Sequence, residues 1–154
     1  MTWMRRQLAR DEGFTLIELM VVVLIIAILI AIAIPTFLGA RERAQDRASQ
    51  SDLRNALTAA KVFYVDEEAY LDTDVATTIT ALEGIEPSLD FDTVANTDTD
   101  AVGFLGTADT VIFVNESESG TFFCIADQST GTTYGSGAAL ADVDTVAECQ
   151  DAGW

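Results

Sequence analysis

The chain has 154 residues, of which 49% are apolar and 21% charged, and it carries a formal net charge of -17 and no histidine. All eight Lys and Arg residues lie at or before Lys61, whereas residues 62–154 hold 19 Asp and Glu and no basic residue, so this part should repel nucleic acid and anionic lipid surfaces. The absence of histidine excludes Ser-His-Asp triads and imidazole metal sites, and we expect no enzymatic activity.

Residues 1–13 form a short charged leader, MTWMRRQLARDEG. The leader contains Arg5, Arg6 and Arg10 and no apolar run, so it is not the hydrophobic part of a secretory signal. We expect it to lie in the cytoplasm.

Residues 14–38 are almost entirely apolar, with four exceptions: Thr15, Glu18, Pro35 and Thr36. As an α-helix this segment would span about 37 Å at 1.5 Å per residue, which exceeds the roughly 30 Å hydrocarbon core of a bilayer. The sequence therefore predicts a transmembrane helix.

Residues 39–65 continue the helical period but become amphipathic. Leu53, Leu57, Ala60 and Tyr64 recur at the spacing of one helix face. We expect one long helix that includes both segments, with a kink or a weak point at Pro35 and Gly39, because proline removes a backbone donor and glycine lowers helix propensity.

Residues 66–154 are predicted to hold a loop-rich connector up to residue 100, followed by an antiparallel sheet and a C-terminal tail. The strand-like runs cover 101–105, 110–114, 121–126 and 132–136. A small sheet needs a cover for its apolar face, and the Leu53, Leu57 and Tyr64 stripe is the candidate. The expected fold class is α+β, with a long N-terminal helix packed on a small antiparallel sheet.

Two cysteines, Cys124 and Cys149, lie in this acidic part. Their spacing is too wide for a redox Cys-x-x-Cys motif and their number too small for a zinc site. We expect one structural disulfide, which contributes about 3 kcal/mol in the chain-entropy model. Since disulfides need an oxidising compartment, we expect this part of the chain to lie outside the cell membrane.

Acidic residues gather in three short clusters that offer hard oxygen ligands of the kind calcium takes. The candidate ligands are Asp66, Glu68, Asp72, Asp74, Asp98 and Asp100. None of the clusters matches the EF-hand loop, so we favour a solvated acidic surface with no bound cofactor, and calcium binding stays the alternative.

The run GFTLIELM at residues 13–20 resembles the processing and methylation motif of type IV pilins and of the pseudopilins of type II secretion and competence systems. The small Gly13, the apolar Phe14 and the acidic Glu18 fall where that family places them, and the resemblance extends along the helix to about residue 65.

The resemblance implies that a membrane-bound prepilin peptidase cleaves between Gly13 and Phe14 and that the new Phe14 amine is methylated. Glu18 would then pair with the Phe14 amine of an adjoining subunit, since carboxylates in a bilayer are normally paired and functional. The implied partners are further copies of the chain in a helical filament, an inner-membrane assembly platform and, before assembly, membrane lipid.

Three functions stay open from the sequence. We favour a pilus-like filament for adhesion, motility or DNA uptake, located outside the cell or across its envelope. The first alternative is the major pseudopilin of a type II secretion or competence system. The second is a single-pass anchored binding domain that never polymerises and has no need of Glu18.

Overall fold

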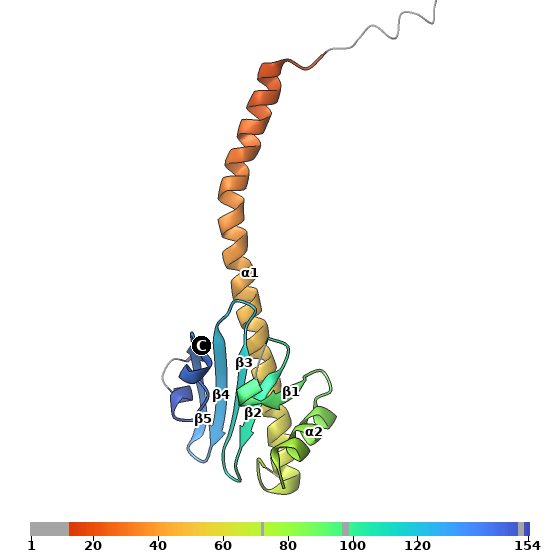
Figure 1. The fold of residues 1–154 in the computed structure, drawn as a ribbon, viewed down its shortest axis with the longest axis vertical. Helices are drawn as coiled ribbons and strands as arrows, with labels where there is room; N and C mark the ends of the chain where they lie inside the picture. Colours follow the sequence, from red (N-terminus) through yellow and green to blue (C-terminus); the bar gives the residue numbers. More distant parts are fainter. Residues whose placement is uncertain (1–12, 72, 97–98, 151–152) are drawn as a thin grey trace, which may run out of the picture. The chain divides into compact units, whose positions relative to one another are not determined.

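The computed structural model describes residues 13–71, 73–96, 99–150 and 153–154. Their helices, strands and short 3-10 helices are, in chain order, α1 Leu16–Glu67, α2 Val75–Ile85, β1 Phe91–Thr93, η1 Val94–Asn96, β2 Val102–Gly106, β3 Val111–Glu116, β4 Phe122–Gln128, β5 Gly131–Gly137, η2 Leu140–Asp142 and η3 Glu148–Gln150 (Figure 1). The chain divides into two compact units, of which the first ends at Ala40 and the second, Arg41–Trp154, is called the head.

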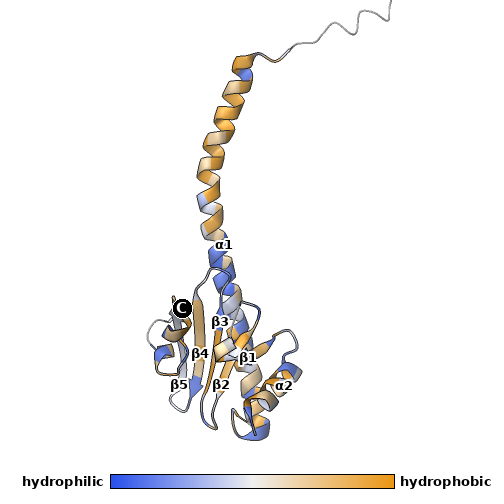
Figure 2. Ribbon diagram, viewed as in Figure 1, coloured by the Kyte–Doolittle hydropathy of each residue, from blue (hydrophilic) through white to orange (hydrophobic). Residues whose placement is uncertain are grey.

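The first part of α1 is largely apolar, and Figure 2 shows it mostly orange, apart from a blue patch near its start, before the helix becomes mixed in the head. Among the described residues, α1 contains the one segment that is long and apolar enough to cross a membrane. The length and composition predicted for the transmembrane segment are therefore present in the folded chain.

Pro35 and Gly39 lie inside α1, which continues through both residues without a break. Proline has no N–H to donate to the carbonyl four residues earlier. The hydroxyl of the adjacent Thr36 donates to the carbonyl oxygen of Ile32 at 3.1 Å, a local bond of a kind that often bends helices. The loosening expected at this position stays a prediction.

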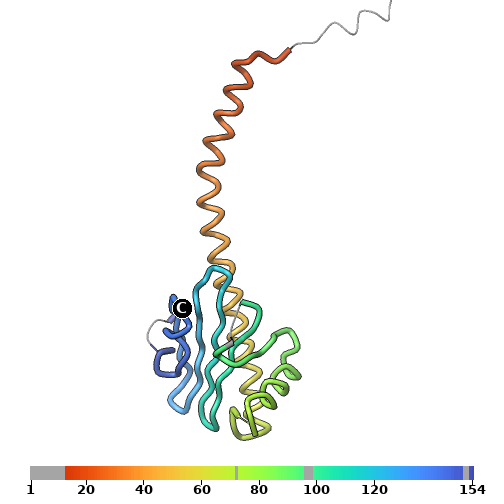
Figure 3. Tube along the Cα trace, in the orientation of Figure 1, coloured from red at the N-terminus to blue at the C-terminus, as the bar shows by residue number. Residues whose placement is uncertain are grey.

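The five strands form one sheet in the order β1-β2-β3-β4-β5 (Figure 3). Strands β2 to β5 pair antiparallel with their neighbours, as the sequence predicts. The short β1 pairs parallel with β2 and forms one edge of the sheet. β1 was not predicted from the sequence, because its three residues are too few to show an alternating pattern.

The core of the head lies between α1 and one face of this sheet. Apolar side chains of both elements meet there, including Leu53, Leu57, Ala60 and Phe63 of α1 and Phe104, Phe113, Phe123 and Ile125 of the strands. Tyr64, predicted to belong to the buried stripe, is instead 36% exposed and packs on the ring of Tyr70, with centroids 4.6 Å apart. Phe63 takes the core position because it follows Ala60 at i+3, on the same helix face.

Residues 66–100, predicted as a loop-rich connector, contain the helix α2 as well as β1. Asp74 caps α2 by accepting a hydrogen bond from the backbone N–H of Thr77 at 2.9 Å, and this bond lowers the pKa of Asp74. The buried Leu82 joins α2 to the core. The prediction missed α2 because its β-branched residues, as in VATTITALEGI, have modest helix propensity.

The other face of the sheet carries a smaller apolar cluster around the disulfide. Cys124 of β4 is bonded to Cys149 of η3, with Cα atoms 5.9 Å apart, which confirms the predicted pairing. Ile112, Ala126 and Val143 are buried beside them.

Candidate functional site

The N-terminal end of α1 is held by a reciprocal pair of hydrogen bonds between Thr15 and Glu18. The backbone N–H of Thr15 donates to Oε2 of Glu18 at 2.8 Å, and the N–H of Glu18 donates to Oγ1 of Thr15 at 3.3 Å. The Thr15 hydroxyl also donates to the same Oε2 at 2.7 Å. This arrangement is a capping box, in which threonine and glutamate satisfy each other's backbone donors.

The capping box fixes the Glu18 carboxylate at the start of the helix. Without it the backbone N–H groups of Thr15 and Glu18 would have no intrahelical partner, because they precede the intrahelical ladder. Phe14 directly precedes Thr15, and its side chain is 90% exposed. The structure therefore places a carboxylate beside the point at which cleavage after Gly13 would create a new amine.

The apolar surface that follows is uncovered. From Leu16 to Leu38, every large apolar side chain is at least 49% exposed. Isolated soluble chains rarely expose apolar surfaces of this extent, so a long continuous one marks a membrane or protein contact. The only charged group within it is Glu18.

The candidate calcium ligands do not come together in the described part of the chain. Asp72 and Asp98 lie outside the described residues, as do the leader arginines Arg5, Arg6 and Arg10. Among the residues that the structure describes, no three His, Cys, Asp or Glu side chains come together, and Asp74 serves as the cap of α2. Calcium binding by Asp66, Glu68 and Asp100 stays an untested prediction.

A polar cluster around Asp127 was not predicted from the sequence. Its Oδ1 lies 3.2 Å from Nζ of Lys61, its Oδ2 accepts a hydrogen bond from the Tyr70 hydroxyl at 2.6 Å, and Thr132 donates to it as well. Burial acts to raise the pKa of Asp127, but the hydrogen bonds from Thr132, Tyr70 and Lys61 outweigh it and lower the pKa. Burial and the adjacent carboxylate raise the pKa of Tyr70. The cluster ties α1 to the β4–β5 hairpin.

A second polar cluster joins α1 to the β3–β4 turn. Asp46 accepts hydrogen bonds from the hydroxyls of Ser117 at 2.9 Å and Ser119 at 2.6 Å, and Gln45 donates to Glu118 in the same turn. Both clusters connect residues that lie more than 50 positions apart, so no local sequence pattern predicts them.

The N-terminal part of the chain is similar to known proteins. Residues 8–34 match the model of the prokaryotic N-terminal methylation motif. The chain is 46% identical to the type IV major pilin protein PilA of Myxococcus xanthus over 63 residues. This aligned segment is 41% of this chain and 29% of that protein. The matched motif and this similarity support the type IV pilin and pseudopilin family.

Two further relatives are a pilus component and a secretion system protein. The type IV wide pilus major component PilA4 of Thermus thermophilus is 31% identical over 84 residues, or 54% of this chain and 64% of that protein. The type II secretion system core protein G of Vibrio cholerae is 33% identical over 69 residues, which are 45% of this chain and 47% of that protein. The chain thus spans 29% to 64% of the length of these three relatives. No solved structure shows a significant match.

The matched methylation motif contains the predicted site residues. Gly13, Phe14 and Glu18 all lie within the matched segment. The match supports the family assignment, while cleavage, methylation and ion pairing at these residues stay predictions for this chain.

Proposed function

We propose that the chain is the precursor of a structural subunit of a type IV pilus-like filament. The observation that carries this proposal is the uncovered apolar part of α1 with one carboxylate, Glu18, fixed at its start. A lipid anchor explains the apolar surface and the helix cap, but it gives no use to the negative charge of Glu18. A helix that leaves lipid for a protein bundle explains both features.

Processing would act as the switch for assembly. In the precursor the Phe14 nitrogen is a neutral peptide group. Hydrolysis of the Gly13–Phe14 bond by a prepilin peptidase consumes one water and gives a Gly13 carboxylate and a Phe14 ammonium, which becomes available to a carboxylate. In a medium of low dielectric constant this charge pair is strongly favoured over two separate charges. Methylation of the Phe14 amine follows in our proposal.

The proposed precursor has its leader in the cytoplasm and its head outside, where the Cys124–Cys149 disulfide is stable. An inner-membrane assembly platform would receive the processed chain from the lipid. Subunits added head to tail through surfaces that do not close on themselves form a helical fibre.

A second function, the major pseudopilin of a secretion or competence system, is favoured by one observation. The relatives include type II secretion system core proteins G from two organisms. This alternative keeps the same processing and polymerisation and differs in where the filament ends. A single-pass anchored binding domain would need neither.

Intact-mass and N-terminal analysis of a sheared cell-surface fraction, without reducing agent, tests the proposal. We expect a chain that begins at methylated Phe14 and is two hydrogens lighter than its reduced form. An empty sheared fraction with processed chain in the envelope favours the pseudopilin. A chain that retains residues 1–13 contradicts both and leaves the anchored binding domain.

A further inference from the structure

Four basic residues lie in one line along the head part of α1: Arg43, Arg47, Arg54 and Lys61, here called the basic stripe. They follow one another at steps of four, seven and seven residues. With 3.6 residues per turn, these steps keep all four within about 40° around the helix. All four side chains are exposed, so the stripe lies on the surface of the head.

Two of the four residues of the basic stripe already make contacts within the chain. Lys61 lies 3.2 Å from Asp127 of β4, and the Arg54 guanidinium lies 4.7 Å from the centre of the Trp154 ring. These contacts place the stripe on the side of α1 toward β4 and the C-terminus. Arg43 and Arg47 form no ion pair with any residue that the structure describes.

At the sheet edge formed by β1, the charged residues are all acidic. The strand order puts β1 at the far end from β5, and α2 packs beside β1. This edge, here called the acidic edge, carries Glu83, Glu86, Asp90 and Asp92. Among the described residues, no Lys or Arg forms an ion pair with these carboxylates.

We propose that Arg43 and Arg47 of one copy bind the acidic edge of a second copy. The proposal rests on the proposed filament function and adds a contact between heads to it. Because the two surfaces differ and lie on opposite sides of the head, the contact is heterologous and repeats without closing. Complementary charge of this kind sets partner choice, register and association rate, and it weakens as salt screens it.

A second copy fits the basic stripe better than an anionic lipid surface does. The net charge of -17 repels the head as a whole from an anionic lipid surface and from a second copy alike, but in the proposed filament helix packing already brings a second copy close to the stripe. A second copy presents its acidic edge as a local surface of the right sign, and every copy in a filament supplies both surfaces in equal number.

Charge reversal and its rescue test the contact in the full chain. We expect Arg43→Glu with Arg47→Glu to lower the yield of sheared filaments at least tenfold, with leader cleavage and disulfide formation unchanged. Adding Glu86→Lys and Asp90→Lys to the same chain should restore the yield. Filaments at the original yield in the reversed variant, or no recovery in the combined variant, overturn the proposal.

Two control variants separate this contact from a general effect of charge. Arg43→Lys with Arg47→Lys keeps both cations and should assemble normally. Ser129→Glu with Thr130→Glu, in the exposed β4–β5 turn, changes the net charge by the same amount as Arg43→Gln with Arg47→Gln. Only the arginine pair should lose filaments. An equal loss in both pairs, or a loss of membrane insertion or leader cleavage in the arginine variants, overturns the proposal.

A photo-crosslinker at the exposed Ser51, one turn after Arg47, tests the contact between two copies even where no filament is shed. We expect crosslinks in membranes and in sheared fractions between residue 51 of one copy and residues 83–92 of another, and their loss in the charge-reversed variant. Crosslinks that fall elsewhere, or none, overturn the contact. The absence of shed filaments alone counts against the proposed pilus function and leaves the crosslinking result to judge the contact.

Discussion

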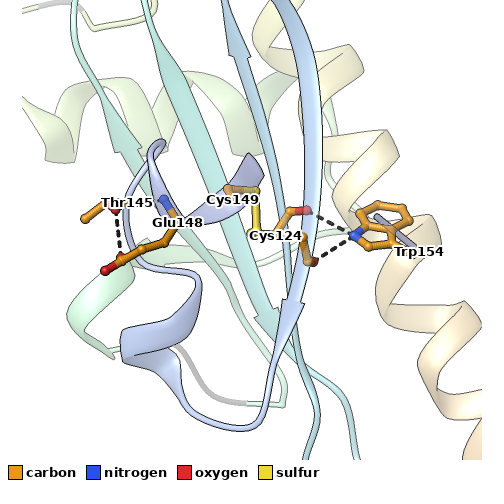
Figure 4. The surroundings of a disulfide bond; sticks show 6 residues. Cys124, Thr145, Glu148, Cys149 and Trp154 are labelled. Atoms are coloured by element: carbon orange, nitrogen blue, oxygen red, sulfur yellow. Dashed lines mark hydrogen bonds between the residues drawn. A yellow bond between two sulfur atoms is a disulfide. The ribbon is translucent and has the colours of Figure 1, made fainter. Parts of the chain in front are cut away.

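Cys149 and Trp154 are held on opposite faces of the sheet, although they lie close together at the end of the chain (Figure 4). Cys149 is bonded to Cys124 on the face away from α1. Trp154 packs with the core on the α1 side, where its Nε1–H points to the carbonyl oxygens of Gly135 at 2.9 Å and Cys124 at 3.1 Å. The β4–β5 pair is therefore clasped from both faces by the C-terminal tail.

Replacing Trp154 should destabilise the head. Trp154→Ala removes the indole hydrogen bonds, the edge contacts with Tyr134 and Phe123 and the Arg54 contact, and we expect a loss of about 2–4 kcal/mol in unfolding free energy. Trp154→Phe keeps most of the ring packing and should lose about 1 kcal/mol. Urea unfolding of the full chain in detergent measures both, and equal losses in the two variants would contradict a role for the indole N–H.

Gly135 lies against the disulfide and should not tolerate a side chain. A Cβ at this position would stand 2.8 Å from Sγ of Cys124, so Gly135→Ala should cost about 1–3 kcal/mol through overpacking. In a Cys124→Ala, Cys149→Ala background the obstructing sulfur is gone and the cost of Gly135→Ala should fall. Urea unfolding of wild type, Gly135→Ala, the double cysteine variant and their combination gives a double-mutant cycle. Strictly additive losses would refute the contact.

Asp127 should give the head a pH-dependent contribution to stability. Its pKa is lowered in the folded state, so its stabilising effect is present above the unfolded pKa of about 3.9 and is lost as the pH falls through the folded pKa. Asp127→Asn should cost about 1.5–3 kcal/mol at neutral pH and progressively less below about pH 4. The exposed Asp109→Asn serves as control. A difference between wild type and Asp127→Asn that is constant with pH would contradict the cluster.

Asp46 should hold the β3–β4 turn on α1. Asp46→Ala leaves the buried hydroxyl of Ser117 without an acceptor for its proton, which should cost about 1–3 kcal/mol and speed hydrogen exchange in residues 116–121. Asp46→Asn keeps an acceptor oxygen and should lie between wild type and Asp46→Ala. Exchange measured by mass spectrometry reports on the turn directly, and unchanged protection there in Asp46→Ala would count against the clamp.

Glu18 has two roles that a pair of substitutions can separate. Glu18→Ala removes both the helix cap and the charge, whereas Glu18→Gln keeps a side chain that serves in capping boxes and removes only the charge. We expect both variants to be inserted and cleaved and neither to form filaments. Filaments from Glu18→Gln would show that the cap, rather than the ion pair, is what assembly requires.

The sequence by itself determined the features that are local along the chain. The transmembrane length follows from the composition of one continuous segment, and the family motif occupies adjacent residues, Gly13 to Met20. The strands β2 to β5 also came from local patterns, because turn residues separate short apolar runs. The disulfide followed from counting, since two cysteines allow one pairing.

Only the tertiary structure decided which distant residues meet. Asp127, Lys61 and Tyr70 come together because the folded sheet brings β4 beside α1, and Trp154 reaches Arg54 and Gly135 only after the tail has docked. The short α2 and β1 likewise gain their stability from packing on the core more than from propensity. These contacts depend on long-range packing, which cooperative burial of apolar surface selects and which no single stretch of sequence encodes.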